Sequence, residues 1–194
     1  VSPAGGNLKE PVTESTKKAA RCFYALEQNR ADQKRYPAVN PIDSYSKYLE
    51  YPEIREFLDE KIEAGWADKV SKAKNIIRQG RDAAEQINIL GDDGVPMSYH
   101  ETFWKSELLD FVFLQQDAFD AVDSLCGLER QKFMLNLILD ICGRQFEFEN
   151  FEECRNFFKE MINDLRQMNY TEFHSEDFEK YNSQLSKLLE ENGK

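Results

Sequence analysis

Apolar residues recur at helical spacing through most of the chain after residue 52. Met134, Leu137, Ile138 and Ile141, for example, follow the i, i+3, i+4, i+7 pattern of an amphipathic helix. The same periodicity predicts helices over residues 53–63, 66–90, 100–113, 128–141, 150–168 and 178–189. Several amphipathic helices in series, joined by short loops, are typical of a helical bundle.

The first 50 residues have a different character. Residues 1–13 are rich in Gly, Pro and polar side chains, which predicts a loop or an extended segment. Residues 19–26 are compatible with a helix by spacing and with a short buried strand by their apolar cluster. Pro37 and Pro41 then require extended backbone and exclude a continuous helix.

Composition narrows the classes of partner. The 194 residues carry a net charge of −11, whereas a general nucleic-acid binder needs a basic face. We therefore expect no nucleic-acid partner, and no apolar stretch approaches the ~20 residues of a membrane helix. The chain begins with Val and has no charged-then-apolar signal before its polar start, so we interpret it as a fragment or a processed product.

The four cysteines, Cys22, Cys126, Cys142 and Cys154, form no CxxC pair, and the chain has only two histidines. This spacing predicts buried free thiols and no metal site, and reduced thiols suit a cytoplasmic location.

No motif for catalysis is present in this sequence. It contains no GxxxxGK(S/T) phosphate loop, and neither His100 nor His174 has neighbours that suggest a nucleophile pair. We expect both histidines to lie at the surface or to cap helices. The acidic pairs at residues 92–93, 152–153, 176–177 and 190–191 have polar neighbours, so we expect solvated faces or loops. No catalytic residue is therefore assigned to the chain.

Two aromatic segments could bind a planar ligand. Tyr36 precedes Pro37, and flanking proline gives a ring the stiffness that a stacking platform needs. Residues 113–120, Phe-Leu-Gln-Gln-Asp-Ala-Phe-Asp, place amides that can bond to a purine edge between two rings. From these residues alone, a domain seam at Tyr36 and a buried helix corner at Phe113 and Phe119 are the favoured interpretations.

The ordered motifs together resemble those of the catalytic A (alpha) subunits of V-type (A/V-type) ATP synthases. The resemblance covers about residues 2–131. It is carried by Ser-Pro-Ala-Gly-Gly-Asn at 2–7, Glu-Pro-Val-Thr at 10–13, Tyr-Ala-Leu-Glu at 24–27, Tyr-Pro-Ala-Val-Asn at 36–40, Ser-Tyr-Ser-Lys-Tyr at 44–48, the 113–120 segment, and Val122-Asp123, Cys126 and Glu129-Arg130-Gln131. Asn7, Glu27 and Tyr36 depart from the commoner family residues.

The resemblance implies a mainly α fold. Residues 1–50 would be the end of a RecA-like nucleotide-binding domain, a short α/β remnant with a strand at about 19–26. Residues 51–194 would be the C-terminal helical domain. Tyr36 would stack on adenine, and Phe113, Gln116, Ala118 and Phe119 would complete the pocket wall.

The resemblance also implies the setting. Phosphates and Mg²⁺ of ATP or ADP would be held upstream of Val1, and the fragment alone would be inactive and bind nucleotide weakly. Its partners would be a B subunit, which supplies an arginine, and a central rotor shaft. The complex would be a cytoplasmic head that reaches the membrane only through other subunits and drives H⁺ or Na⁺ translocation. The alternative is a freestanding acidic helical domain without enzymatic activity, which binds another protein.

Overall fold

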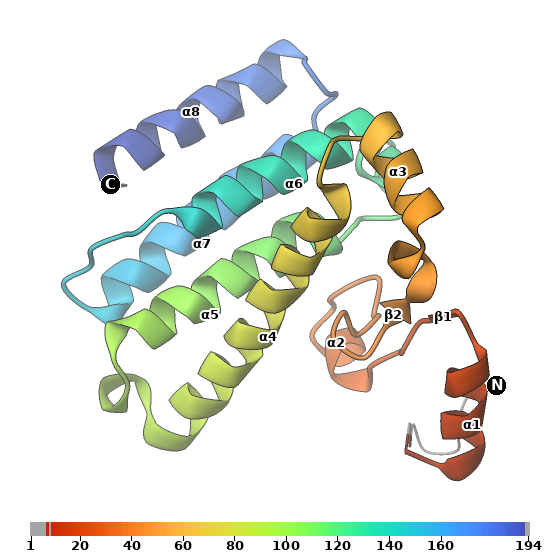
Figure 1. Ribbon diagram of the computed structural model, residues 1–194. Helices are drawn as coiled ribbons and strands as arrows, with labels where there is room; N and C mark the ends of the chain where they lie inside the picture. The colour runs from red at the N-terminus through yellow and green to blue at the C-terminus, as the bar shows by residue number, and fades with distance from the viewer. Residues whose placement is uncertain (1–6, 8, 193–194) are drawn as a thin grey trace. The chain divides into compact units, whose positions relative to one another are not determined.

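The computed structural model describes residue 7 and residues 9–192 (Figure 1). The chain divides between Ala67 and Asp68 into two compact units. The domain boundary predicted between residues 50 and 51 stays a prediction.

The first unit is small and mixed. Its elements are α1 (Pro11–Ala19), β1 (Cys22–Phe23), α2 (Gln28–Asp32), β2 (Tyr45–Ser46), the 3-10 turn η2 (Lys47–Glu50) and α3 (Pro52–Lys61). β1 and β2 pair antiparallel, with Cys22 opposite Ser46 and Phe23 opposite Tyr45. The rings of Phe23 and Tyr45 stack at 5.9 Å across this pair.

Two predictions for the first unit need correction. The segment expected to be irregular up to residue 13 already contains the start of α1, because Pro11 occupies a first-turn position where its missing N–H costs nothing. The strand expected at 19–26 is confined to Cys22–Phe23, with one further bridge between Leu26 and Val39. The Ser-Pro-Ala-Gly-Gly motif at 2–6 lies outside the described residues.

The second unit is helical. It contains most of α4 (Trp66–Leu90), then α5 (Met97–Leu109), α6 (Leu128–Gly143), α7 (Phe151–Asn169) and α8 (Glu176–Asn192). α5 packs against α6 and α7, and α7 packs against α8 (Figure 1). The predicted helices are confirmed, and the chain has the expected mainly α fold with one very small sheet among the described residues.

The core of the second unit follows the predicted apolar faces. On α7, every residue of the predicted stripe is buried: Cys154, Phe157, Phe158, Met161 and Leu165. α6 and α8 contribute buried side chains to the same core, namely Met134, Leu135, Ile138, Leu139, Ile141, Phe178, Leu185 and Leu189. Within the described part of the chain, no helix is long and apolar enough to span a membrane.

Candidate functional site

One turn at the end of α5 departs from regular α-helix. Residues Asp110–Leu114 form a single π-helical turn, in which the Gln115 amide donates to the Asp110 carbonyl at 3.0 Å. The Asn169 side chain donates to the Val112 carbonyl at 2.7 Å and so ties this turn to the end of α7. Such π turns occur frequently at functional sites. This one orients Phe113, which is half-buried.

The loop that follows is ordered by three aspartates. The Asp117 amide donates to Asp123 Oδ2 at 2.6 Å, and the Phe119 amide donates to Asp117 Oδ1 at 2.9 Å. Asp120 Oδ1 accepts from the amides of Val122 and Asp123, both at 2.8 Å. Carboxylates that accept from nearby amides build Asx-type turns, which restrict the loop without any regular helix or strand.

The loop presents an uncovered aromatic ring. The Phe119 side chain is 100% exposed, and Ala118 and Gln116 beside it are exposed as well. Gln116 Nε2 donates to the Asp123 carbonyl at 2.7 Å, so its amide helps to hold the loop. The hydrogen bond from the Phe119 amide to Asp117 therefore fixes the backbone that carries this exposed ring.

A buried guanidinium supports the base of this loop. Arg130 donates to the carbonyls of Met168, Asn169 and Thr171 at 2.9, 2.7 and 3.0 Å. These carbonyls lie at the C-terminal end of α7, where unpaired acceptors and the helix dipole favour a positive charge. Arg130 therefore positions Asn169, which in turn holds the π turn.

Asp123 lies within this framework. Burial raises the pKa of the Asp123 carboxyl, while the hydrogen bond from the Asp117 amide and the charge of Arg130 act in the opposite direction. The carboxyl is thus partly desolvated by its role in the loop.

A small cavity of about 160 Å³ lies beside the π turn. Its wall includes residues from the π turn, the ordered loop, α6 and α7: Val112, Phe113, Leu114, Gln115, Gln116, Asp123, Cys126, Gln131, Met134 and Asn169. Four of these carry side-chain amides. The site therefore combines an aromatic surface with several hydrogen-bonding groups.

Tyr36 belongs to the first unit. Its ring is 53% exposed, and its hydroxyl donates to the Ala31 carbonyl at 3.5 Å. The next segment is fixed by hydrogen bonds from the Glu27 amide to the Ala38 carbonyl at 3.0 Å and from the Asn40 amide to the Ala25 carbonyl at 2.7 Å. The ring is therefore attached to an ordered segment and has a free surface.

The structure brings four of the five predicted site residues together. Phe113, Gln116, Ala118 and Phe119 occupy one π turn and its loop in the second unit, and Tyr36 lies in the other unit. The buried helix corner considered for Phe119 is wrong, because its side chain is fully exposed.

Sequence reasoning missed the residues that support this site. Asn169 gave no local signal, and the motif that contains Arg130 did not indicate its contacts with the end of α7. The aspartates at 117, 120 and 123, spaced by three, were the one pattern that could have predicted an Asx-stabilised loop.

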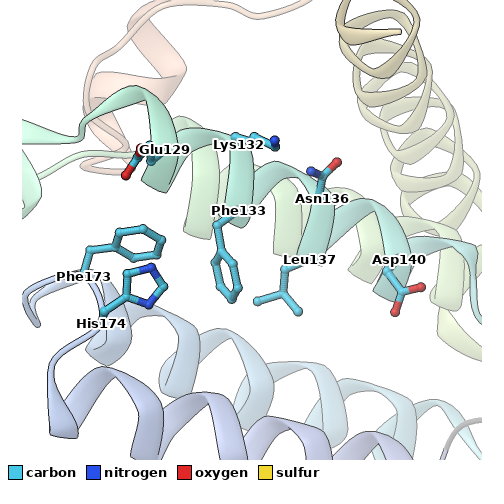
Figure 2. A pocket seen from close by; sticks show the side chains of 8 residues that line it. All are labelled: Glu129, Lys132, Phe133, Asn136, Leu137, Asp140, Phe173 and His174. Atoms are coloured by element: carbon cyan, nitrogen blue, oxygen red, sulfur yellow. The ribbon is translucent and has the colours of Figure 1, made fainter. Parts of the chain in front are cut away.

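A second hollow, of about 580 Å³, lies along α6 (Figure 2). Phe133 and Leu137 point into it, and Phe173 and His174 lie at one end. Polar side chains of α6 line its border, namely Glu129, Lys132, Asn136 and Asp140. His174 Nδ1 lies 3.2 Å from Glu179 Oε1, so this exposed histidine is paired with a carboxylate of α8.

Two predictions about reactive side chains need correction. His100 is buried: its ring stacks on Phe151 at 5.5 Å, and Nε2 lies 2.9 Å from the Asp92 carbonyl. Cys22 is exposed rather than buried, because it lies on a two-residue strand with little to cover it.

The remaining thiols are more enclosed. Cys154 is buried, while Cys126 and Cys142 are half-buried. In the described part of the chain, no group of three or more His, Cys, Asp or Glu residues could hold a metal ion.

The fold and the site define a class of protein: a helical-bundle domain, preceded by a small mixed unit, that presents an aromatic and amide loop. The model of the C-terminal domain of V and A type ATP synthase matches residues 55–174. The chain belongs to this family.

Full-length relatives extend the comparison. The chain is 40% identical over 190 residues to the V-type ATP synthase alpha chain of Chlamydia muridarum, and 39% identical to that of Chlamydia pneumoniae. Each alignment covers 98% of this chain and 32% of the relative. The chain therefore spans about a third of the length of these relatives.

A solved structure supports the fold. The ATP synthase subunit NeqB from Nanoarcheaum equitans superposes with a TM-score of 0.54 at 17% identity, covering 72% of this chain and 32% of that one. At this identity, the likeness concerns the fold alone.

Proposed function

We propose that this chain is the C-terminal part of the catalytic subunit of a rotary V-type ATPase or ATP synthase, which couples ATP hydrolysis or synthesis to translocation of H⁺ or Na⁺. The relatives named as V-type ATP synthase alpha chains support this proposal. The structural observation that carries it is Phe119, a fully exposed ring on a loop that three aspartates hold in place.

The chain would supply the wall of an adenine pocket. Phe113, Ala118 and Phe119 offer apolar surface from one ordered loop, and Gln116 offers an amide beside them. Tyr36 would stack on the base from the first unit. Stacking on a ring requires a flat face and little loss of conformational freedom, and the backbone hydrogen bonds of both segments support this proposal.

The chemistry of the phosphates would lie elsewhere in the subunit. This sequence has no GxxxxGK(S/T) motif, and its described residues include no acidic cluster suited to Mg²⁺. A phosphate loop upstream and an arginine from a neighbouring B subunit would complete the site. The chain by itself would not hydrolyse ATP, so protein-dependent turnover by the pure chain would contradict this part of the proposal.

The helical unit would also transmit motion. At the α4–α5 turn, Ile89 and Leu90 are 74% and 57% exposed, and Asp92 and Asp93 follow in the turn. An apolar and acidic tip of this kind could contact a central rotor shaft. A pocket wall on a moving domain binds nucleotide differently in its two positions, which is the requirement for coupling. The complex would be cytoplasmic and peripheral to the membrane.

Kinetics of the full-length subunit in its assembled complex would test the adenine wall. Loss of base stacking costs about 1–3 kcal/mol, so we expect Phe119→Ala and Tyr36→Ala to raise the KM for ATP about 5- to 150-fold. Leu125→Ala is the matched control, because Leu125 is 81% exposed in the same loop region but lies outside the proposed wall. Equal KM values for Phe119→Ala and Leu125→Ala would contradict the assignment of Phe119.

A further inference from the structure

Gln115 has an unusual environment among the amides of the site. Its Nε2 is buried, and no described residue accepts a hydrogen bond from it. The side chain lines the cavity of about 160 Å³ beside the π turn. A buried donor without a partner costs free energy, so such groups in native structures call for a specific explanation.

The other three amides on the cavity wall are already engaged. Gln116 Nε2 donates to the Asp123 carbonyl at 2.7 Å, and Gln131 Nε2 donates to the Cys126 carbonyl at 2.9 Å. Asn169 Nδ2 donates to the Val112 carbonyl at 2.7 Å. These three amides build the site by bonding to backbone. Gln115 lies on the same wall with its donor unused by the protein.

The backbone fixes where this donor lies. The Gln115 amide closes the π turn by donating to the Asp110 carbonyl at 3.0 Å, and Asn169 holds the turn from α7. Gln115 is also two residues from Phe113 and next to Gln116, both assigned to the proposed adenine wall. A donor on a rigid turn beside a stacking surface is positioned to bond to the edge of a stacked base.

The size of the cavity limits its occupant. Complete small-molecule pockets measure about 300–1,000 Å³, so this cavity can hold only part of a ligand. A purine edge fits this limit, because the rest of the nucleotide would lie outside the cavity. Each unprotonated ring nitrogen of adenine is an acceptor, which is the group that an amide N–H requires.

We propose that Gln115 is a specificity-determining residue, whose buried side-chain amide donates a hydrogen bond to one ring nitrogen of the adenine base. This inference rests on the proposed function, since it requires that adenine occupy this site. It gives the unused donor a partner in the nucleotide-bound state.

The test uses the full-length subunit in its assembled complex, with Gln115→Leu as the first variant. The substrates are ATP and the three ATP analogues in which one adenine ring nitrogen at a time is replaced by carbon. We expect Gln115→Leu to lower kcat/KM for ATP about tenfold. For one of the analogues, we expect the variant and the unaltered enzyme to have equal kcat/KM values, because that analogue lacks the ring nitrogen that would accept the hydrogen bond from Gln115. A coupling of this kind to a single ring atom would not arise from a merely structural role.

Two further variants keep the test decisive. Gln115→Met retains an unbranched side chain but lacks the donor, so it should reproduce the result if leucine disturbs packing. Gln167→Leu removes an exposed amide from α7 and should leave kcat/KM unchanged. Removing an unpaired buried donor should not lower the melting temperature, because no hydrogen bond within the protein is lost.

Failure of the inference can be told apart from failure of the proposed function. Suppose that Tyr36→Ala and Phe119→Ala raise KM, but that the Gln115 variants lower kcat/KM by the same factor for all four nucleotides or do not lower it for any of them. The hydrogen bond from Gln115 to adenine is then refuted, and the proposed adenine wall stands. If none of these variants affects KM, both proposals are refuted.

Discussion

A close approach of α4 and α5 at Gly80 predicts that adding one methyl group lowers stability. Gly80 lies within α4, and a Cβ added there would lie 2.0 Å from Ser106 Cβ and 2.2 Å from Ser106 Oγ on α5. Carbon atoms in contact are normally about 3.5–4.0 Å apart, so Gly80→Ala requires the helices to separate. The atom in the way is a Cβ, which cannot rotate aside.

The magnitude follows from two opposing effects. Overpacking of a core position costs about 1–3 kcal/mol, whereas Ala in place of Gly within a helix contributes about 0.5–1 kcal/mol of stability. We therefore expect Gly80→Ala to lower the free energy of unfolding by about 1–2 kcal/mol. Urea denaturation of the chain, followed by circular dichroism, would measure it.

Substitutions at Ser106 make this reasoning testable. Ser106→Gly removes both clashing atoms and leaves Ser106 Cα as the nearest group, at 3.5 Å. The double variant with Gly80→Ala should therefore recover stability, with a coupling energy of at least about 1 kcal/mol. Ser106→Ala keeps the Cβ and should not rescue.

Gly143→Ala is the matched control, since a Cβ at Gly143 would meet nothing within 4 Å. It should leave stability unchanged or slightly raised. Wild-type stability of Gly80→Ala, or additivity of Gly80→Ala and Ser106→Gly, would refute the reasoning.

Three further predictions concern buried polar groups. Arg130→Met should lower the free energy of unfolding by about 3 kcal/mol or more in urea denaturation, because three carbonyls lose a charged donor. Asp123→Asn should raise the free energy of unfolding at neutral pH but not at acidic pH. The pKa of the Asp123 carboxyl is raised in the folded chain, so the wild-type chain loses stability as the pH rises through that pKa and the carboxyl becomes charged. The uncharged asparagine side chain does not undergo this loss. Burial raises the pKa of Cys142 and of Cys154 to about 12, so a thiol reagent at pH 8 should label exposed Cys22 first and these two only after unfolding; rapid labelling in the folded chain would contradict this.

The helices of the second unit could be predicted because their cause is local. The apolar residues from Cys154 to Leu165 recur at helical spacing and form one face of the helix. A helix with such a face buries it against the core, whichever elements it packs against. The N-terminal end of α7 is equally local: Asn150 Oδ1 accepts from the Glu153 amide at 2.9 Å, three residues away. The first unit gave weaker signals, because residues 19–26 fit two periods and the sheet has only two residues in each strand.

The candidate site could be predicted only in part. The motifs at Tyr36 and at 113–120 led to the segments proposed here, because a family resemblance is carried by the order of residues along the chain. They could not show which glutamine has an unused donor. That depends on Asp123 and on α7, which reach Gln116 and the π turn through the fold.

By itself, the sequence determined the family, the mainly α class and the apolar faces of α6, α7 and α8, since each depends on neighbours within a few residues. Only the tertiary structure decided that His100 is buried against Phe151 and that Gly80 meets Ser106. It also decided that Gln115 keeps an unused donor. These features join residues far apart in the chain, and contact, burial and hydrogen-bond partners exist only once the helices have packed.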